Sequence, residues 1–156
     1  RVLFRSARKE QQLQGKGQAT EKEKMTLKGM RFLIADDNDL NAEILEELLK
    51  MEGADCDRAV NGKEAVEMFA RAEEGRYNII LMDIKMPVMN GYDATKEIRR
   101  LKKKEAAKIP IFAMTANAFA EDIRTCMEAG MDAHIAKPVD LDLLEENIRI
   151  YMQAKA

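Results

Sequence analysis

The sequence predicts an α/β fold, a doubly wound, five-stranded parallel sheet with helices on both faces. Short apolar runs without polar alternation recur along the chain, which is typical of strands buried on both faces of a parallel sheet. Amphipathic helical stretches lie between these runs, and right-handed crossovers would place them on both sides of the sheet. The chain has 156 residues, an apolar fraction of 46% and no tryptophan, which suits one domain with an aliphatic, methionine-filled core.

The first 29 residues differ in composition from the rest of the chain. They carry eight basic and three acidic residues, a net charge of +5, whereas the remainder carries −7. Because they are rich in Gln, Lys, Glu and Gly, we expect a linker or disordered tail before a domain at residues 30–154. Residues 1–6 can also be back-translated into a string that resembles the end of a sequencing adapter, so they are either an artefact or part of that tail. We expect a fragment of a longer gene.

The first expected strand, residues 31–35, is an apolar run that ends in Asp36-Asp37-Asn38. A helix is expected from residue 39 to residue 51, because apolar side chains recur along it at helical spacing. The side chains that share one face of this helix are Leu40, Ile44, Leu48 and Met51. Gly53 suits a C-terminal cap of the helix.

Two further strands flank the next expected helix. Residues 54–60 are less apolar than the first run, so we expect a strand with a weaker pattern there, which suits the edge of the sheet. Asn61-Gly62 turns the chain, and Asn61 suits the N-cap of a helix that stops at Gly75. The inner face of this helix is expected to consist of Ala65, Met68, Phe69 and Ala72. Residues 79–82 have no polar alternation and predict a buried, central strand.

The remaining chain continues the alternation. A helix is expected after Asn90-Gly91, ending near Leu101. The basic run at residues 99–104 suits its solvated C-terminal end, with a docking surface as the alternative. Strands are expected at residues 109–114 and 133–136, and helices at residues 118–129 and 140–153. In the last helix, the side chains expected to point inward are Leu141, Leu144, Ile148 and Met152.

Composition excludes several classes of function. The acidic charge of the expected domain does not suit nucleic-acid binding. No apolar run approaches about 20 residues, so we expect neither a transmembrane helix nor membrane contact by this segment. Cys56 and Cys126 lack the spacing of a metal or redox site, which fits a reduced, cytoplasmic location.

Four of the five expected strands end in a functional group. These groups are Asp36-Asp37, Asp83, Thr115 and Lys137, with 47, 32 and 22 positions between them counted from Asp36. The carboxyl ends of parallel strands share one edge of the sheet, so the groups can converge there. Carboxylates held together repel each other unless a cation joins them, and a hard divalent ion such as Mg²⁺ suits oxygen ligands.

Lys137 and Thr115 extend this cluster to a site for a phosphoryl group. Two cations and a hydroxyl donor can neutralise and bind the oxygens of a transferred phosphoryl group, with Asp83 as the nucleophile that becomes an aspartyl phosphate. Each residue also has a plainer explanation: Asp36 or Asp37 as a helix N-cap, Thr115 as another cap, Lys137 as a surface lysine. Their occurrence at successive strand ends favours the phosphoacceptor site.

Four motifs resemble those of the receiver domains of bacterial two-component response regulators. They are Asp36-Asp37-Asn38, residues 83–91, Thr115-Ala116-Asn117-Ala118 and Lys137-Pro138, and the resemblance covers about residues 30–154. Asn38, Asn41 and residues 129–138 are most similar to the C-terminal receivers of hybrid sensor histidine kinases. This resemblance implies a flavodoxin-like fold, in agreement with the predicted α/β class.

The resemblance also implies a role for each residue. Asp83 would accept a phosphoryl group from a phosphohistidine on a histidine kinase or histidine phosphotransfer protein. Asp37, Asp83 and the backbone carbonyl of Lys85 would bind Mg²⁺, and Asp36 would act through a water. Lys137, before a cis Lys137-Pro138 bond, would pair with Asp83 and then with the phosphoryl group. Thr115 would move to bond a phosphoryl oxygen, which is the switch.

His134 departs from the family pattern, which often has Tyr or Phe at this position. It is either a second switch residue or a partly exposed structural histidine. Lys85 and Asn117 lie two residues after Asp83 and Thr115, respectively. Both would flank the path of hydrolytic water and set the lifetime of the phosphate.

Three functions are compatible with these residues. The first is a phosphorelay receiver in signal transduction, which catalyses its own phosphorylation and dephosphorylation without a separate substrate. The second is a docking module that acts without phosphate, although such a receiver should lack some of the five site residues. The third is a Mg²⁺ phosphatase with an Asp nucleophile, which would require a second Asp where Lys85 stands. We expect a cytoplasmic domain, either separate or within a membrane-anchored hybrid kinase.

Overall fold

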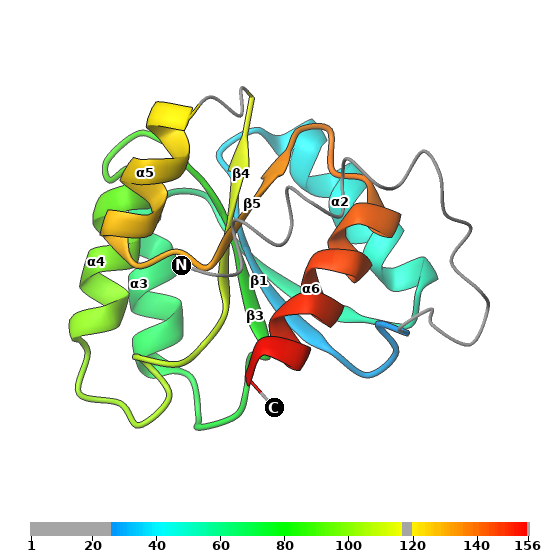
Figure 1. Cartoon of the computed structure of the whole chain (residues 1–156), viewed down its shortest axis with the longest axis horizontal. Coiled ribbons are helices and arrows are strands. Elements are labelled where there is room, and N and C mark those ends of the chain that lie inside the picture. The colour runs from blue at the N-terminus through cyan, green and yellow to red at the C-terminus, as the bar shows by residue number, and fades with distance from the viewer. Residues whose placement is uncertain (1–25, 117–119, 156) are drawn as a thin grey trace.

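A computed structural model describes residues 26–116 and 120–155 of the chain (Figure 1). The tail expected at residues 1–29 therefore lies almost entirely outside the described residues, and residues 1–6 lie wholly outside them. Asn117 and the first two residues of the helix expected at 118–129 are likewise not described. Leu27, just ahead of the expected domain, is fully buried in the core.

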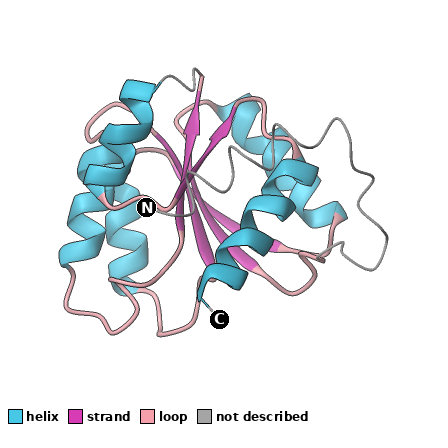
Figure 2. Ribbon diagram, viewed as in Figure 1, coloured by secondary structure: helices cyan, strands magenta, loops and turns pink. Residues whose placement is uncertain are grey.

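The described residues form one sheet of five parallel strands in the order β2-β1-β3-β4-β5. The strands are β1 (Arg31–Ala35), β2 (Asp55–Ala59), β3 (Ile79–Asp83), β4 (Ile111–Thr115) and β5 (Ala133–Ala136). The helices are α2 (Asp39–Met51), α3 (Gly62–Arg71), α4 (Gly91–Arg100), α5 (Ala120–Ala129) and α6 (Leu141–Lys155). Figure 2 shows the sheet between two layers of helices, which confirms the predicted doubly wound α/β class.

Strand side chains alternate between two cores, one on each face of the sheet. Phe32 and Leu81 pack on the face covered by α2 and α6. Leu33 and Met82 pack on the opposite face, which α3, α4 and α5 cover (Figure 1). Fully burying one such side chain contributes about 1.5–3 kcal/mol, so the two cores hold the strands rigidly in place.

The register of the sheet brings the ends of four strands to one edge. The pairs at this edge are Ala35 with Met82, Asp83 with Met114, and Thr115 with Ala136. Asp36 directly follows Ala35 and therefore lies at the level of Asp83, whereas Lys137 lies two positions beyond Ile135, the residue of β5 at that level. The edge strand β2, predicted to be the weakest, ends in Ala59 and adds no acidic or hydroxyl group there.

Asparagines cap three of the helices. Asn38, Asn61 and Asn90 each accept a hydrogen bond from the backbone N–H three residues later, on Asn41, Glu64 and Asp93. Because Asn38 is the N-cap of α2, the plainer explanation of Asp36 or Asp37 as that cap is wrong. The predicted caps Asn61 and Gly53 are confirmed, the latter with a φ of +84° just after α2.

The apolar face predicted for α2 is not the face that packs on the sheet. The helix buries Ala42, Leu45 and Leu49. The side chains of Leu40, Ile44 and Met51 are 65%, 50% and 79% exposed. The helix carries two apolar stripes, and the spacing of residues alone does not say which stripe faces the sheet. The exposed stripe leaves an apolar surface on α2.

The predicted inward face of α6 is largely confirmed. Leu144 and Ile148 are buried, and Leu141 packs against the same core. Met152 is exposed, contrary to the prediction, because the neighbouring Tyr151 takes the inward position and packs on Phe112. Within the part of the chain described here, each helix is too short or too polar to cross a bilayer.

Candidate functional site

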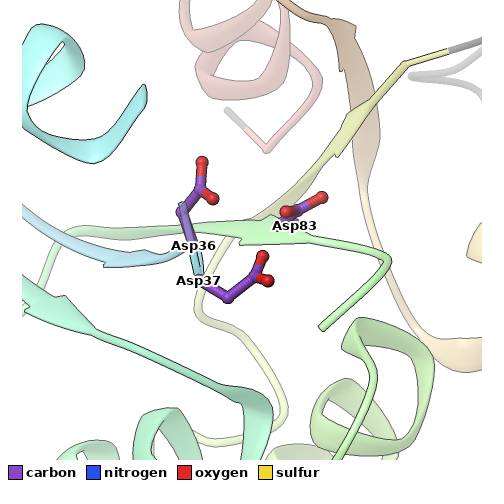
Figure 3. A group of neighbouring side chains, drawn as sticks. All are labelled: Asp36, Asp37 and Asp83. Atoms are coloured by element: carbon purple, nitrogen blue, oxygen red, sulfur yellow. The ribbon is translucent and has the colours of Figure 1, made fainter. Parts of the chain in front are cut away.

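Three carboxylates meet at the edge of the sheet where the strands end (Figure 3). Asp83 is the last residue of β3, and Asp36 and Asp37 directly follow β1. Oxygen atoms of all three lie within 4.8 Å of one another. Asp36 and Asp83 are only 1% and 7% exposed, whereas Asp37 is exposed. The structure thus brings together the three acids that the sequence placed at the ends of two strands.

Lys137 places its ammonium group between two of these acids. Its Nζ lies 2.9 Å from Oδ2 of Asp83 and 3.3 Å from Oδ2 of Asp36. Its backbone N–H donates to the carbonyl of Thr115 at 2.8 Å, which anchors the residue beyond the end of β5. The Lys137-Pro138 bond is cis, as predicted. The cluster therefore holds a fixed cation beside the buried carboxylate of Asp83.

Burial and charge act in opposite directions on this pair. Burial raises the pKa of Asp83, Lys137 lowers it, and the charges of Asp36 and Asp37 raise it again, so the pKa lies above its ordinary value. Burial lowers the pKa of Lys137, but its hydrogen bond to Asp83 and the acidic charges outweigh this effect and raise the pKa. Lys137 therefore stays protonated, and the surroundings of Asp83 destabilise its ionised form.

Thr115 and His134 lie on the neighbouring strands β4 and β5. Thr115 is buried, and its Oγ1 has no hydrogen-bond partner among the described residues. His134 lies opposite Ala113, and Thr115 lies opposite Ala136, so both side chains point to the same face of the sheet. His134 is buried rather than partly exposed. A buried hydroxyl without a partner is costly, and an oxygen of a bound anion could satisfy it.

The loop after Asp83 lines an open groove of about 530 Å³ beside Asp37. Lys85 is exposed in this groove. Helix α4 begins against the loop, because a Cβ on Gly91 would lie 2.2 Å from the carbonyl oxygen of Asp83. Val88 has a φ of +70° and is the central residue of a γ-turn in which Met89 N–H donates to the Pro87 carbonyl at 2.7 Å. The loop is thus tightly constrained on one side and open on the other.

Arg58 contributes to the site and was not predicted. From β2, its Nε and Nη2 donate to the backbone carbonyl of Asp36 at 3.1 and 2.9 Å. Its Nη1 pairs with Asp39 at 2.8 Å. No motif marks this arginine, since its main acceptor is a backbone carbonyl. Only the strand pairing, which sets Arg58 opposite Ile34 next to the β1 end, could have indicated it.

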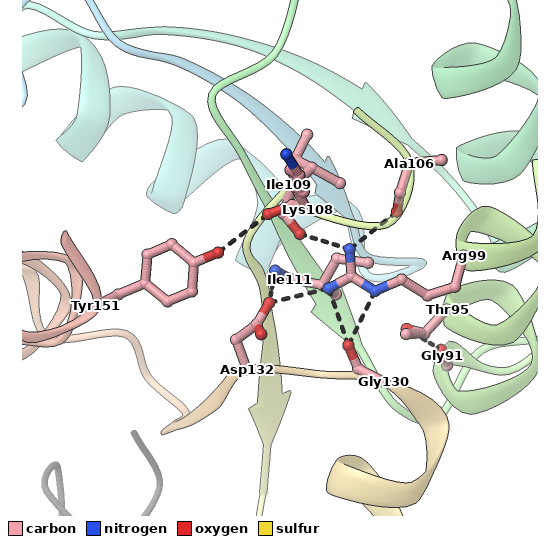
Figure 4. A network of polar contacts seen from close by, with 10 residues as sticks. All are labelled: Gly91, Thr95, Arg99, Ala106, Lys108, Ile109, Ile111, Gly130, Asp132 and Tyr151. Atoms are coloured by element: carbon pink, nitrogen blue, oxygen red, sulfur yellow. Dashed lines mark hydrogen bonds and ion pairs between the residues drawn. The ribbon is translucent and has the colours of Figure 1, made fainter. Parts of the chain in front are cut away.

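The basic run at residues 99–104 is not simply a solvated helix end. Arg99 donates to the carbonyls of Ala106, Ile109 and Gly130 and pairs with Asp132 at 2.9 Å (Figure 4). Lys103 donates at 2.6 Å to the carbonyls of Phe69 and Ala72 at the end of α3. Aligned carbonyls at helix and loop ends attract cations, which explains these contacts. Because Arg99 and Lys103 join neighbouring elements in this way, they are not available for docking.

The carboxylate cluster fits a hard divalent cation. Its donor atoms are carboxylate oxygens, which Mg²⁺ prefers, and a cation bound between the three acids would offset the repulsion among their charges. The exposure of Asp37 gives a cation access to the cluster from the groove. The arrangement can therefore bind a divalent cation beside a nucleophilic carboxylate.

Comparisons with known proteins agree with this geometry. The family model described as "Response regulator receiver domain" matches residues 32–149. The peroxide stress-activated histidine kinase mak1 of Schizosaccharomyces pombe is 36% identical over 117 residues, which is 74% of this chain. The chain spans only 7% of the length of that relative.

Two solved structures of receiver domains are also similar to the chain. One is the receiver domain of the sensor histidine kinase PA1611 from Pseudomonas aeruginosa, with a magnesium ion coordinated in its active-site cleft. It is 34% identical, with a TM-score of 0.67 over 82% of this chain and 99% of that chain. The other is the receiver domain of the histidine kinase CKI1 from Arabidopsis thaliana, complexed with Mg²⁺ and BeF₃⁻. It is 32% identical, with a TM-score of 0.70 over 81% of this chain and 92% of that chain.

Proposed function

We propose, because the chain belongs to the response regulator receiver domain family, that Asp83 accepts a phosphoryl group from a phosphohistidine of a partner protein. The observation that carries this proposal is the convergence of three carboxylates and one ammonium group at the sheet edge. The acids Asp36, Asp37 and Asp83 lie within 4.8 Å of one another, and the Lys137 amine lies 2.9 Å from Asp83. A phosphoryl acceptor needs this combination of a nucleophile and nearby positive charge.

The transfer is a displacement at phosphorus. A carboxylate oxygen of Asp83 forms the new P–O bond, the P–N bond to the partner's histidine breaks, and the electron pair of that bond stays on the imidazole nitrogen. Lys137, whose pKa is raised, keeps its proton and balances charge on the phosphoryl oxygens. Mg²⁺, when bound, neutralises further charge there. Its expected ligands are Asp37, Asp83 and the backbone carbonyl of Lys85, with Asp36 acting through a water.

Thr115 would convert the transfer into a conformational signal. Its buried Oγ1 has no partner among the described residues, and a phosphoryl oxygen on Asp83 would be one. His134 shares its face of the sheet and would respond to the movement of Thr115 as the second switch residue. Lys85, exposed at the groove, and Asn117 would flank the path of hydrolytic water and set the lifetime of the phosphate. The protein would thus catalyse its own phosphorylation and dephosphorylation without a separate substrate.

The exposed apolar stripe of α2 supports docking of a partner that carries the phosphohistidine. Leu48 and Ile44 line a pocket of about 350 Å³, and the same pocket is lined by the site residues Asp36 and Lys137. An apolar surface that begins at the catalytic groups suits a helical protein that must bring one side chain to Asp83. The partner is therefore a histidine kinase or a histidine phosphotransfer protein.

The relatives indicate the kind of longer protein in which this domain would occur. The relative mak1 is a histidine kinase of which this chain spans 7%, and the two receiver-domain structures described above come from histidine kinases. We propose that residues 30–154 form the receiver domain, preceded by a linker, of a hybrid sensor histidine kinase. The domain would face the cytoplasm, including where the kinase is anchored in a membrane.

A titration with Mg²⁺ and beryllofluoride, a mimic of the phosphoryl group, tests the proposal. With both present, we expect changes in the NMR signals of backbone amides near Asp83, Thr115 and Lys137. Neither reagent alone should produce the full change, and Asp83→Asn should abolish it. Asp142→Asn, at an exposed acid of α6, is the matched control and should respond like the wild type.

The alternatives predict different results. A docking module that acts without phosphate would show no change with Mg²⁺ and beryllofluoride, which would contradict the proposal. A Mg²⁺ phosphatase would release phosphate from an ester over many turnovers. That result is not expected, because Lys85 occupies the position at which a second Asp would serve as the general acid.

A further inference from the structure

We propose that Arg58 is a positioning residue of the phosphoacceptor site, which holds the backbone between Asp36 and Asp37 in the conformation that binds a divalent cation. This inference rests on the proposed function, because it concerns the same cation site. It adds a residue of the edge strand β2, the strand of the described sheet whose end carries none of the predicted site residues.

All three nitrogen atoms of the Arg58 guanidinium group contact the segment that runs from the end of β1 to the start of α2. Nε and Nη2 both donate to the carbonyl of Asp36, at 3.1 and 2.9 Å, and Nη1 lies 2.8 Å from Oδ1 of Asp39. The Arg58 side chain is only 18% exposed, although Asp39 is exposed. The Arg58 side of these contacts is therefore shielded from solvent. Hydrogen bonds from a charged donor are strong in such surroundings.

The carbonyl that Arg58 holds belongs to the peptide unit between the two acids. Because a peptide unit is planar, fixing the orientation of the Asp36 carbonyl also fixes where the backbone of Asp37 starts. The remaining groups of Asp36 are held by other partners: its N–H donates to Ala59, its Oδ1 accepts from Asn38 N–H, and its Oδ2 faces Lys137. Among the described residues, Arg58 is the one that donates hydrogen bonds to the peptide that leads to Asp37.

Two effects of Arg58 on cation binding have opposite signs. As a positive charge near the acids, it disfavours a second cation, so loss of its charge alone would tighten Mg²⁺ binding. As a restraint on the acid pair, it pre-organises the site, so its loss would weaken Mg²⁺ binding. The geometry favours the second effect, since two of the three contacts are made to the backbone carbonyl of Asp36 and the third to Asp39, which is not an expected ligand of the cation.

Lysine cannot replace the arginine in this role. The planar fork of a guanidinium group donates through two nitrogens to one carbonyl and through a third to Asp39, whereas an ammonium group is a single point on a flexible stem. Arg58→Lys therefore keeps the charge but loses the restraint, and Arg58→Gln loses both. The two variants separate charge from position.

The experiment measures the Mg²⁺ dissociation constant by calorimetry for the wild type, Arg58→Lys and Arg58→Gln, and the thermal unfolding of each without Mg²⁺. We expect both variants to bind Mg²⁺ about tenfold more weakly, as for other residues that orient metal ligands. Arg76→Lys is the control, because Arg76 pairs with Asp57 of the same strand at 3.0 Å. It should leave Mg²⁺ affinity unchanged whatever its effect on thermal unfolding.

Unchanged Mg²⁺ affinity in Arg58→Lys would overturn the inference, as would tighter binding by Arg58→Gln, because either result would show that only the charge matters. A loss of affinity in the Arg76→Lys control that equals the loss in Arg58→Lys would also overturn it, since general destabilisation would then be the cause. If Arg58→Gln does not fold, Arg58→Lys alone decides. Absence of Mg²⁺ binding by the wild type would instead overturn the proposed function.

Discussion

Asp83 is ionised in a place that does not favour its charge. Burial comes first among the causes that raise its pKa, the neighbouring acids add to it, and Lys137 opposes it only in part. A carboxyl group whose pKa is higher in the folded than in the unfolded protein binds its proton more tightly when folded. The free energy of unfolding therefore falls as the pH rises from the ordinary pKa of an Asp to the raised pKa of folded Asp83. Ionised Asp83 destabilises the fold, and a bound cation can relieve this effect.

Asp83→Asn should consequently raise the thermal unfolding temperature at neutral pH when Mg²⁺ is absent. The advantage should shrink as the pH falls from above the raised pKa of folded Asp83 towards about 3.9, the ordinary pKa of an Asp, and should be lost below that pH, where wild-type Asp83 is protonated in both states. Calorimetric unfolding across this pH range checks both points. Added Mg²⁺ should stabilise the wild type more than the variant. A variant that is less stable at neutral pH without Mg²⁺ would contradict this account of Asp83.

Val88 is a second residue whose conformation has a cost. A β-branched residue at a φ of +70° is strained, and the exposed Val88 side chain gains little packing there. Val88→Gly should therefore raise stability by roughly 1 kcal/mol, as measured by urea denaturation. Val60→Gly is the control: this exposed valine has no positive φ and should lose stability. A lower urea midpoint for Val88→Gly would show that the γ-turn is not strained.

Helices and strands differ in how well the sequence predicts them. The strands were predictable because their apolar runs are continuous, and the edge position of β2 followed from its weaker run. The orientation of α2 was not, because the helix has two apolar stripes and Leu45 and Leu49 pack inward instead of Leu40 and Ile44. Spacing defines a stripe, but only contact with the rest of the fold selects the one that is buried.

The exposed stripe of α2 leads to a prediction about the phosphoryl donor. Replacing Leu40 and Ile44 by Gln should change stability by no more than about 0.5 kcal/mol, since both side chains are at least half exposed. Phosphotransfer from a partner protein should slow, while labelling by a small acyl phosphate should continue at the wild-type rate. The comparison of initial rates with the two donors checks this. Equal rates with both donors for the variant and the wild type would exclude α2 as the docking surface.

Helix α4 is packed so closely on the site that its first residue must be glycine. Gly91→Ala would place a Cβ 2.2 Å from the carbonyl of Asp83, so the loop or the helix must move. We expect a loss of roughly 2 kcal/mol of stability and weaker binding of beryllofluoride. Gly75→Ala, at a φ of +82° but with open space around it, should cost about 1 kcal/mol and leave that binding unchanged. Normal beryllofluoride binding by Gly91→Ala would show that this contact does not position the site.

At the scale of the whole molecule, the sequence predicts the order of the elements and the residues at the sheet edge, but not the contacts that link distant elements. The order of strands and helices follows from hydrophobic periodicity, and a parallel sheet then brings its strand ends together, so the acids, Thr115 and Lys137 could be placed at one edge from the sequence. The contacts of Arg58 and Arg99 could not, because both arginines bond mainly to backbone carbonyls, which leave no pattern in the side chains. Such arginines link elements that are distant in sequence and set the geometry in which the acids act.

The most direct measurement is covalent labelling with a small acyl phosphate, followed by mapping of the modified residue by mass spectrometry. We expect one phosphoryl group, on Asp83, that appears only with Mg²⁺ and is absent from Asp83→Asn. A phosphoryl group on another residue, labelling that does not depend on Mg²⁺, or no labelling of a folded protein would contradict it.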